Sequence, residues 1–415
     1  MNLEDDLSRL AEFSAAGSGV TRLAWSPEHL EALRWLIGRA EEAGMAATLD
    51  PAGNLIAQWE GDGGGPAFAL GSHLDSVPTG GRYDGALGVL GGLAAIELLR
   101  ERGFSPSGPV WLVAFMDEEG TRFGESMFGS RAFVGEELDL YLRQMDSDGV
   151  TVAEAMRNAG FDPASVANAA GIDQVGTFVE LHVEQGRVLA DAGIDVGVVT
   201  SIVGLLQARV EVGGQSDHGG ATPMVGRRDA LVAAARMIVT LRDWARSETE
   251  MTATIGSISA LPGAYNVIPG QCTFSVDLRA AGEAEFESAR AALEPLIARL
   301  AQDESVDASV TFSDQIPPAP LDEELIELIE RAAEEEGASH MRMPSGAGHD
   351  AQVLARRIST GMVFVPSSDG ISHSPNEFTT PQHCELGARV LARLVELAQD
   401  GEGNQTANAD ARQPA

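Results

Sequence analysis

The sequence predicts an α/β protein in which a mixed sheet is flanked by helices and a small ferredoxin-like α+β domain interrupts the chain. The first observation is a nearly continuous apolar run, Val110–Met116, which is typical of a strand buried on both faces of a sheet. It follows a helix-forming segment rich in Ala, Leu and Ile, Ala86–Arg102. The second observation is a change to the order β-α-β-β-α-β after about Ile202. Helix, loop and strand patterns resume from Leu321, so we expect the first domain to be discontinuous.

The N-terminal part begins with a helix that starts at Ser26-Pro27, because serine is a good N-cap and proline suits the first helical position. We expect this helix to end near Gly44, a plausible C-cap. Two short strands should follow, near Asn54–Glu60 and Pro66–Ser72. Strand, helix and strand in this order favour a layered α/β architecture.

The inserted domain is predicted from alternating and helical patterns that follow one another over about 110 residues. Its expected elements are the strand Leu206–Val212, the helix Arg227–Arg246, the strands Thr252–Ala260 and Gln271–Leu278, the helix Glu283–Leu300 and the strand Ala308–Ser313. The proline-rich segment Ile316–Pro320 is typical of a linker. We therefore expect a discontinuous catalytic domain over residues 1–205 and 319–400, an inserted domain over residues 206–318, and a disordered polar tail over residues 401–415.

The charge balance excludes several classes of function. The chain carries a formal net charge of -34, and all 28 of its basic residues are arginines. This acidity argues against nucleic acid and anionic membrane surfaces as partners, and it leaves a cationic partner or a solvated acidic surface as explanations. Without lysine there can be no Schiff base, no Walker-type phosphate site and no metal pair bridged by a carbamylated lysine.

The expected compartment is the cytoplasm. The two cysteines, Cys272 and Cys384, could form one disulfide, but two scattered cysteines are more typical of reduced residues. The N-terminus is acidic, with no basic segment followed by an apolar stretch, so no signal peptide is expected. No apolar run approaches the roughly 20 residues that span a bilayer.

Histidines and carboxylates follow the predicted strands, where open α/β sheets place their sites. His73 and Asp75 lie two residues apart at the end of a strand, and a metal-bound imidazole usually donates its other N–H to a carboxylate, so they could be a ligand and the group that orients it. Asp84 follows in a glycine-containing turn, where its two oxygens could bridge two ions. This segment therefore has the chemistry of a metal site.

Three further segments carry similar groups. The strand Val110–Met116 ends in the carboxylates Asp117-Glu118-Glu119, which are costly to place there without a cation. One of them could bind a metal while its neighbour acts as general base. His182 and His373 each lie among glutamates or polar residues, in Glu180–Gly186 and Gly370–Glu377.

A single histidine beside an aspartate is more often a structural pair than a metal site, but three such histidines, with Asp84 and the run Asp117–Glu119 between them, favour a metal centre. Nitrogen and oxygen ligands without thiolates point to zinc, manganese or cobalt. No Gly-x-Ser-x-Gly elbow appears that could position a serine nucleophile.

The whole run from about Gly71 to Glu377 resembles the M20 family of metallopeptidases and amidohydrolases. Within it, the chain is similar to the group of N-carbamoyl-L-amino acid hydrolases, allantoate amidohydrolases and β-ureidopropionases. The matching segments are Gly71–Asp75, Tyr83–Gly85, Asp117–Phe123, Gly129–Arg131, Glu180–Gly186, Asp217–Met224, Asn266–Gly270, Asp277–Arg279, Ser345–Ala351 and Ile371–Glu377.

The resemblance implies a two-metal aminopeptidase-like catalytic domain and a role for each matching residue. His73 and His182 would bind the first divalent ion, Glu119 and His373 the second, and Asp84 would bridge them. Glu118 would be the general base and Asp75 would orient His73. A histidine at position 182 is typical of the ureido-cleaving group, whereas peptidase members commonly have an acidic residue there.

The inserted domain adds substrate candidates by the same resemblance. His218, Asn266 and Arg279 match positions that hold the substrate carboxylate and carbonyl, and His218 could polarise a developing oxyanion. Gln185, His349 and Asp350 are expected to line the pocket. Some members have glutamine where this chain has Leu205, and this difference counts against allantoate as substrate. Gln207 lies on the same face of the strand and could substitute for that glutamine.

The expected activity is hydrolysis of a ureido or amide C–N bond, most simply in an N-carbamoyl-L-amino acid. Allantoate hydrolysis, dipeptide or acyl-amino acid cleavage, and a non-catalytic metal-binding protein are the alternatives. The resemblance also implies a homodimer joined through the inserted domain, with His218 serving the neighbour's active site, and closure of the small domain over the large one.

Overall fold

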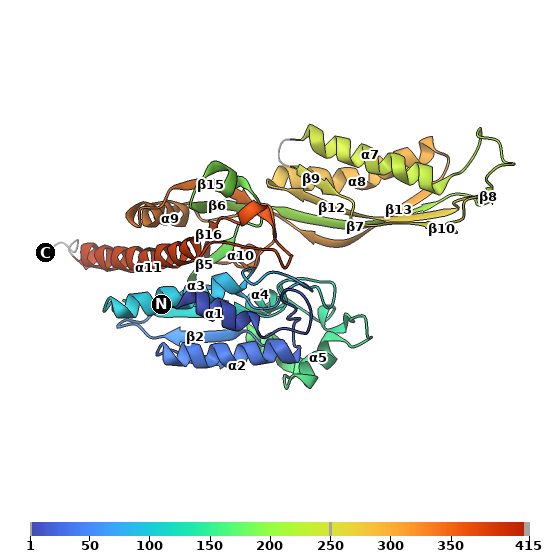
Figure 1. The fold of residues 1–415 in the computed structure, drawn as a ribbon. Coiled ribbons are helices and arrows are strands. Elements are labelled where there is room, and N and C mark those ends of the chain that lie inside the picture. The colour runs from blue at the N-terminus through green and yellow to red at the C-terminus, as the bar shows by residue number, and fades with distance from the viewer. Residues whose placement is uncertain (1, 249–250, 411–415) are drawn as a thin grey trace. The chain divides into compact units, whose positions relative to one another are not determined.

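The computed structural model describes residues 2–248 and 251–410. The chain divides into two compact units. Unit 1 comprises residues 1–200, 320–345 and 349–415, and unit 2 comprises residues 201–319 and 346–348. Unit 2 is thus almost entirely one continuous insertion into the sequence of unit 1 (Figure 1).

A nine-stranded mixed sheet runs through unit 1 in the order β1-β2-β4-β3-β5-β16-β6-β14, with β15 paired to β6. The strands are β1 (Ala46–Leu49), β2 (Leu55–Trp59), β3 (Ala67–His73), β4 (Val110–Phe115), β5 (Val175–Val183), β6 (Val196–Ile202), β14 (Ala319–Pro320), β15 (His340–Ser345) and β16 (Ser359–Val365). The central strands β4, β3, β5 and β16 are parallel to one another. Their carboxyl ends therefore meet at one edge of the sheet, and this edge carries the predicted ligands.

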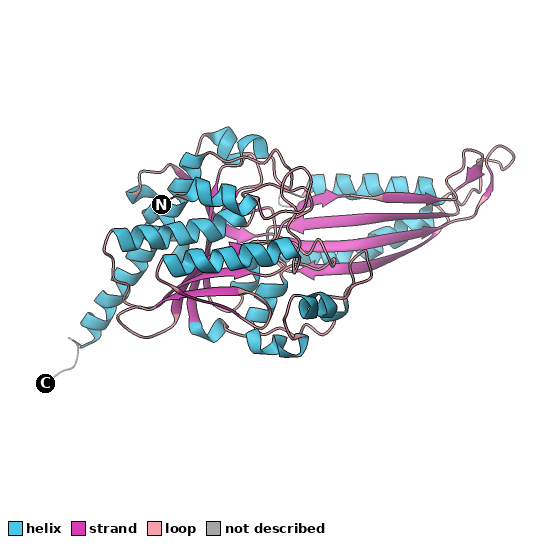
Figure 2. Cartoon of the chain, turned by 60° about the horizontal axis from the view of Figure 1, so that its bottom comes forward, coloured by secondary structure: helices cyan, strands magenta, loops and turns pink. Residues whose placement is uncertain are grey.

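Helices cover the unit 1 sheet (Figures 1 and 2). They are α1 (Leu3–Ala11), α2 (Pro27–Glu42), α3 (Ala86–Glu101), α4 (Phe128–Phe133), α5 (Val152–Asn158), α6 (Val188–Ala192), α9 (Glu323–Glu335), α10 (Asp350–Leu354) and α11 (Pro381–Asp410), with short 3-10 turns at Tyr141–Arg143, Pro163–Ala169, Ile172–Gln174 and Ser368–Gly370. The predicted mixed sheet flanked by helices is confirmed, and α2 has the expected cap, since Ser26 accepts a hydrogen bond from the His29 N–H.

Helix α3 approaches the sheet closely because glycines face it. A Cβ at Gly88 would lie 2.3 Å from the carbonyl oxygen of Leu181, and one at Gly91 would lie 2.5 Å from a methyl carbon of the same leucine. Almost the whole helix is buried. The helix therefore brings its N-terminal end, next to Asp84, against strand β5.

Unit 2 is an antiparallel sheet with two helices on one face (Figure 2). The strands are β7 (Gly204–Gly213), β9 (Met251–Thr254), β10 (Ile258–Leu261), β12 (Gln271–Ala280) and β13 (Asp307–Ile316), in the order β10-β12-β7-β13 with β9 also paired to β12. The helices are α7 (Ala230–Ser247) and α8 (Glu283–Asp303), and a two-stranded ribbon joins β8 (Asp217–His218) to β11 (Val267–Ile268). One apolar core, including Val210, Met237, Phe274 and Leu293, fills the space between sheet and helices.

The predicted strand over Thr252–Ala260 is wrong as a single element. It consists of β9 and β10, which pair with different parts of β12: Thr254 lies opposite Asp277, whereas Ile258 lies opposite Phe274. Between them the Ser257 N–H donates to the Ser275 hydroxyl, and the Ser275 N–H donates to the Ser257 carbonyl. One extra residue near Gly256 interrupts the ladder in the manner of a β-bulge.

Two expected ends also differ. Helix α7 begins at Ala230, three residues after the predicted start, because Asp229 caps it by accepting from the N–H groups of Leu231 and Val232. The polar tail was expected to be disordered from Gly401, but α11 extends to Asp410, with no proline before Pro414 to stop it; residues 411–415 lie outside the described residues. Among the described residues, no helix combines the length and apolarity needed to cross a bilayer.

Candidate metal centre

The candidate ligands gather at the carboxyl ends of the parallel strands of unit 1. His73 ends β3, Glu118 and Glu119 follow β4, and His182 lies near the end of β5. His373 lies on the loop after β16. Residues at the ends of parallel strands meet at one edge of the sheet, and this brings side chains 300 positions apart in the sequence into one site.

The first group consists of His73, Asp84 and His182, whose candidate ligand atoms lie within 4.8 Å of one another. The His182 Nε2 lies 3.1 Å from the Asp84 Oδ1, and the His73 Nε2 lies 3.8 Å from the same oxygen. The Nδ1 atoms donate to backbone carbonyls, that of His73 to Asp75 at 3.0 Å and that of His182 to Val183 at 2.9 Å. Both Nε2 atoms are thereby directed into the site, where they lie against the Asp84 carboxylate and could bind a metal, which is how histidine ligands are usually oriented.

The second group consists of Asp84, Glu119 and His373, which again lie within 4.8 Å of one another. The His373 Nε2 lies 3.1 Å from the Asp84 Oδ2 and 3.6 Å from the Glu119 Oε2. Each oxygen of Asp84 thus faces a different group. The backbone of His373 is left-handed, with φ of 53°, an uncommon conformation for a residue other than glycine that is often found at functional sites.

Asp84 is the electrostatic centre of both groups. Although burial acts to raise the pKa of Asp84, hydrogen bonds from His182 and His373 hold it well below its usual value. Burial acts to lower the pKa of His182, but Asp84 raises it to about 9. The pKa of His373 is raised by its hydrogen bond to Asp84. Asp84 is therefore ionised between two cationic or metal-binding groups.

Asp75 was predicted to orient His73, but its carboxylate accepts no hydrogen bond from the His73 ring. That carboxylate accepts the N–H groups of Glu118 and Glu119, each at 3.1 Å, and its Oδ1 lies 3.7 Å from the His73 Nδ1. The His73 ring donates instead to the Asp75 backbone carbonyl. The carboxylate therefore joins the end of β3 to the residues that follow β4.

Glu118 and Glu119 are buried beside one another. Burial, and then the charge of Glu119, raise the pKa of Glu118 well above its usual value. Burial, and then Asp84, do the same for Glu119. One Glu118 oxygen lies 3.7 Å from the His73 Nε2. Within the described residues, the Glu119 Oε1 is buried without a hydrogen-bond partner, as expected of an atom that requires a cation.

A third group that could hold a metal contains Glu180, His182 and His349. Both oxygens of the Glu180 carboxylate already accept hydrogen bonds within the protein, one from the Ser72 hydroxyl at 2.7 Å and the other from the Ala351 N–H at 3.0 Å. The His349 Nε2 lies 2.9 Å from the Ser345 hydroxyl. These bonds favour the two groups that share Asp84 over the third.

Two polar residues beside the centre have no assigned role from the sequence. Glu377 accepts the N–H groups of Tyr83 and Asp84, at 2.9 and 3.0 Å. The Ser372 hydroxyl lies 3.0 Å from the Glu377 Oε2 and 3.3 Å from the Asp84 Oδ2. The only signal in the sequence is that Glu377 lies four residues after His373.

The predicted pocket residues of unit 1 lie next to these groups. The Gln185 side chain donates to the Asp84 Oδ2 at 3.0 Å, and its left-handed backbone, with φ of 61°, turns the chain away from β5. His349 packs edge-on against His182, with ring centroids 4.6 Å apart. Asp350 is fully buried, and burial and the charge of Glu180 raise its pKa well above the usual value.

The four candidates of unit 2 separate into two places within that unit. Gln207 and Arg279 both contact Asp277: the Gln207 Nε2 lies 3.4 Å from its Oδ2, and the Arg279 Nε donates to its Oδ1 at 3.0 Å. His218 and Asn266 lie on or beside the β8–β11 ribbon and are exposed.

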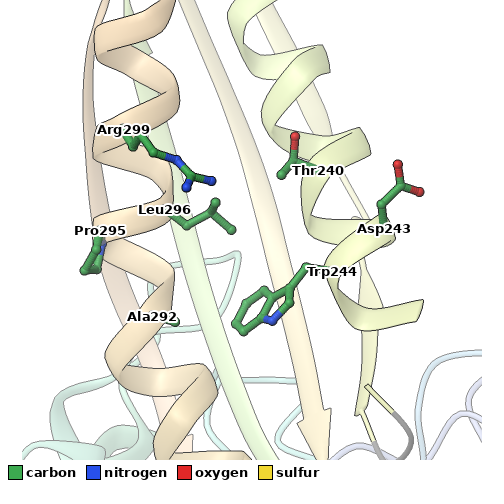
Figure 3. Close-up of a pocket in the computed structure, with 7 residues that line it drawn as sticks. All are labelled: Thr240, Asp243, Trp244, Ala292, Pro295, Leu296 and Arg299. Carbon is green, nitrogen blue, oxygen red and sulfur yellow. The ribbon is translucent and has the colours of Figure 1, made fainter. Parts of the chain in front are cut away.

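Unit 2 also has a hollow of about 550 Å³ between α7 and α8 (Figure 3). The residues that line it are Thr240, Asp243, Trp244, Ala292, Pro295, Leu296 and Arg299. None of them belongs to a candidate metal group.

The donor set fits a pair of divalent cations. Two groups of imidazole nitrogens and carboxylate oxygens share one aspartate, and the Glu119 Oε1 has no hydrogen-bond partner among the described residues. Such ligands suit zinc, manganese or cobalt.

Comparison with known proteins identifies the family of the chain. The model of peptidase family M20/M25/M40 matches residues 69–397. The N-carbamoyl-L-amino acid amidohydrolase of Geobacillus stearothermophilus is 39% identical over 400 residues, which cover 95% of this chain and 98% of that protein. The allantoate amidohydrolase of Bacillus subtilis is 36% identical over 400 residues, covering 95% and 96%.

Solved structures are similar over the same length. A hydantoinase/carbamoylase family amidase from Burkholderia multivorans superposes with a TM-score of 0.85 at 36% identity, over 95% of this chain and 96% of that one. The match to the family model spans both units, and the full-length relatives share more than a third of their residues with this chain. The chain belongs to peptidase family M20/M25/M40, alongside the hydantoinase/carbamoylase amidases.

Proposed function

We propose that this protein is a two-metal hydrolase that cleaves the ureido C–N bond of N-carbamoyl-L-amino acids. The observation that carries the proposal is the position of Asp84, whose two oxygens each face a separate group of nitrogen and oxygen ligands. In the overall reaction, one water and the N-carbamoyl compound give the amino acid, ammonia and carbon dioxide.

His73 and His182 would hold one ion, Glu119 and His373 the other, and Asp84 would bridge them, with zinc, manganese or cobalt as the metals. When bound, such ions polarise a carbonyl oxygen and make water a stronger acid. The Glu119 Oε1, buried without a hydrogen-bond partner among the described side chains, supports its role as a ligand.

Glu118 is proposed as the general base and then the general acid. Its carboxylate lies beside His73 but is not part of either group that shares Asp84. It would take a proton from the attacking water and return it to the leaving nitrogen. Burial, and then Glu119, raise its pKa, which suits a group that must both accept and release a proton. The Asp75 carboxylate accepts a hydrogen bond from the Glu118 N–H and so fixes the backbone that carries the Glu118 side chain.

Substrate recognition is assigned to residues of both units. The Arg279 guanidinium donates to the Asp277 carboxylate, which fixes its position. Arg279 would bind the substrate carboxylate, because arginine presents paired donors in one plane. His218 and Asn266 would hold the carbonyl, and His218 would stabilise the developing oxyanion. Gln185, Gln207, His349 and Asp350 would line the pocket.

Among ureido substrates, the N-carbamoyl amino acids are favoured over allantoate by Leu205, which replaces a glutamine found in some members. Two relatives named N-carbamoyl-L-amino acid amidohydrolases, at 39% and 38% identity, support the same choice. A relative from Arabidopsis thaliana, 36% identical, is named ureidoglycolate hydrolase, so ureidoglycolate must be included among the candidate substrates in the assay.

We also propose a cytoplasmic homodimer joined through unit 2, with His218 serving the partner's active site and the small domain closing over the large one. Apolar side chains near His218 support such an interface, since Met224 and Val225 are 77% and 93% exposed and Tyr265 is fully exposed. Two buried, unpaired cysteines, Cys272 and Cys384, suit a reducing compartment.

The test is ammonia release from N-carbamoyl-L-amino acids, their D forms, N-carbamoyl-β-alanine, allantoate and ureidoglycolate. The purified protein is stripped with chelator and reloaded with manganese, zinc or cobalt. Metal-dependent release from an N-carbamoyl-L-amino acid, lost in Glu118→Ala, is the expected result. If the folded, metal-loaded protein releases no ammonia from any compound of the panel, the ureido assignment is overturned, and dipeptides and acyl-amino acids become the substrates to test.

A further inference from the structure

The His218 side chain is tied to its own loop through one ring nitrogen. The Nδ1 atom accepts the N–H of Gly220 at 3.1 Å and the N–H of Ala221 at 3.0 Å. The loop closes behind it, since the Thr222 N–H donates to the His218 carbonyl at 3.1 Å. The ring is exposed, so these bonds rather than packing decide its orientation.

This arrangement selects one tautomer. A nitrogen that accepts two N–H groups presents its lone pair to them, so the hydrogen of the neutral ring lies on the Nε2 atom. The Nε2–H then points away from the loop as a hydrogen-bond donor. A donor of this kind is what stabilisation of an oxyanion requires.

Arg227 forms hydrogen bonds with the loop that binds the His218 ring. Its guanidinium donates to the carbonyl oxygens of Gly219 at 2.8 Å, Thr222 at 2.7 Å and Pro223 at 3.2 Å. No carboxylate of the described residues forms an ion pair with Arg227. The Nε and Nη2 atoms of the planar guanidinium thus bind three backbone carbonyls within one short loop.

The same loop is bonded to Asn266. The N–H of Gly219 donates to the Asn266 carbonyl at 2.7 Å, and Val267 pairs with His218 in the β8–β11 ribbon. The Gly219 peptide thus contacts Asn266 on one side and Arg227 on the other. Arg227 therefore binds the loop of His218 directly and is linked to Asn266 through Gly219.

We infer that Arg227 is a positioning residue, which fixes the loop over residues 218–224 so that His218 presents its Nε2–H. This inference rests on the proposed role of His218 in the reaction. Arg227 itself would touch neither substrate nor metal. Its loss should leave the ring free to change tautomer while the metal centre of unit 1 keeps its ligands.

The neighbouring arginine provides a matched control. Arg228 donates to the Ser305 carbonyl and to the Asp307 carboxylate, each at 2.8 Å, and has no bond to the loop of His218. Arg227→Met and Arg228→Met remove the same charge from adjacent positions. Arg227→Lys keeps the charge but can reach fewer carbonyls at once, and it is expected to lie between wild type and Arg227→Met.

The first readout is the ring nitrogen spectrum of His218 by ¹⁵N NMR in the full-length, metal-loaded protein. The chain has eight histidines, and His218→Gln identifies the signal. In the wild type and in Arg228→Met, we expect one unprotonated, hydrogen-bonded Nδ1 and a protonated Nε2. In Arg227→Met, the two nitrogens should move toward the averaged values of exchanging tautomers.

The second readout is the split between kcat and KM on the substrate that the panel identifies. We expect Arg227→Met to lower kcat by at least about 10-fold, which is less than the roughly 10²- to 10³-fold effect of removing an oxyanion donor outright, with KM changed by less than about 3-fold. Arg228→Met should match the wild type in both. Thermal unfolding of each variant shows whether the fold is kept.

The two readouts separate the inference from the function on which it rests. His218 signals in folded Arg227→Met that equal those in Arg228→Met would overturn the positioning role. Altered signals in Arg227→Met with full turnover by His218→Ala would uphold the positioning role and remove His218 from the proposed mechanism. The NMR result does not depend on any substrate being turned over.

Discussion

The Glu377 carboxylate binds the backbone N–H of Asp84 at 3.0 Å, although 293 positions separate the two residues. The same oxygen also accepts the Tyr83 N–H, so Glu377 holds the turn that carries Asp84, the proposed bridging ligand. A Cβ at Gly81 would lie 2.2 Å from this carboxylate, which leaves room only for glycine beside it. The position of Asp84 is therefore set from a loop at the other end of the sequence.

Replacement of this carboxylate should weaken metal binding. Glu377→Ala removes the acceptor for two N–H groups, and we expect a 10- to 100-fold loss of affinity, the usual effect of removing a group that orients a ligand. Ser372→Ala, which removes only the hydroxyl between Glu377 and Asp84, should cost less. Metal content after equilibrium dialysis against graded free manganese measures both. Equal affinity in wild type and folded Glu377→Ala would contradict the role.

The proposed general base can be separated from the ligands. Glu118→Gln keeps the size of the side chain and should retain both metals, because Glu118 belongs to neither group that shares Asp84. We expect kcat to fall by about 10²- to 10⁴-fold, the range for loss of a general acid–base. Bound metal, measured beside turnover, is the control. A variant that loses metal in parallel with activity would instead make Glu118 a ligand.

Gly85 is predicted to be intolerant of any side chain. Its φ is +63°, and a Cβ would lie 2.4 Å from the His73 ring. Gly103 provides the control, since its φ is +73° and nothing lies within 4 Å of its Cβ position. We expect Gly103→Ala to lower the free energy of unfolding by about 1–2 kcal/mol from backbone strain alone. Gly85→Ala should lose more than this, and it should also lose metal affinity because His73 must move.

A buried histidine should make the fold sensitive to acid. His29 is fully buried, and within the described residues neither ring nitrogen has a hydrogen-bond partner. Burial, then Arg22 and His73, lower the pKa of His29 from 6.5 to about 3. As pH falls below 6.5 the unfolded chain takes up a proton at this residue and the folded chain does not, so stability is lost down to about pH 3.

The expected slope is about 1.4 kcal/mol per pH unit from this one group. Urea unfolding of chelator-treated protein between pH 6 and 4.5 measures it, and the contribution is the difference between wild type and His29→Leu. The variant should have the shallower pH dependence. His340→Leu controls for removal of a histidine elsewhere. Parallel curves for wild type and His29→Leu would contradict the assignment.

Much of the architecture was predictable because it depends on local patterns. The apolar run that became β4 and the helix that became α3 are visible in neighbouring residues, and histidines or carboxylates that directly follow such strands must meet at one edge of a parallel sheet. The β9–β10 interruption was not predictable, since it depends on a cross-strand exchange between Ser257 and Ser275.

The supporting residues of the site could not be predicted for the same reason. Nothing near Glu377 in the sequence shows that it holds the turn of Asp84, and nothing near Asp75 shows that its carboxylate is used by the N–H groups of Glu118 and Glu119. These contacts arise only when distant segments meet. The ligands themselves are local in pattern, whereas the groups that hold them in place are not.

The division of the chain has a consequence for evolution and for engineering. The residues of both groups that share Asp84 come from unit 1, whereas His218, Asn266, Arg279 and Gln207 come from the single continuous segment over residues 201–319. A gene segment of this kind can be diversified or exchanged as one cassette while the codons for the ligands stay untouched. Selection for a new substrate can therefore act on four of the seven proposed substrate residues within less than a third of the coding sequence, while the candidate metal ligands are inherited unchanged.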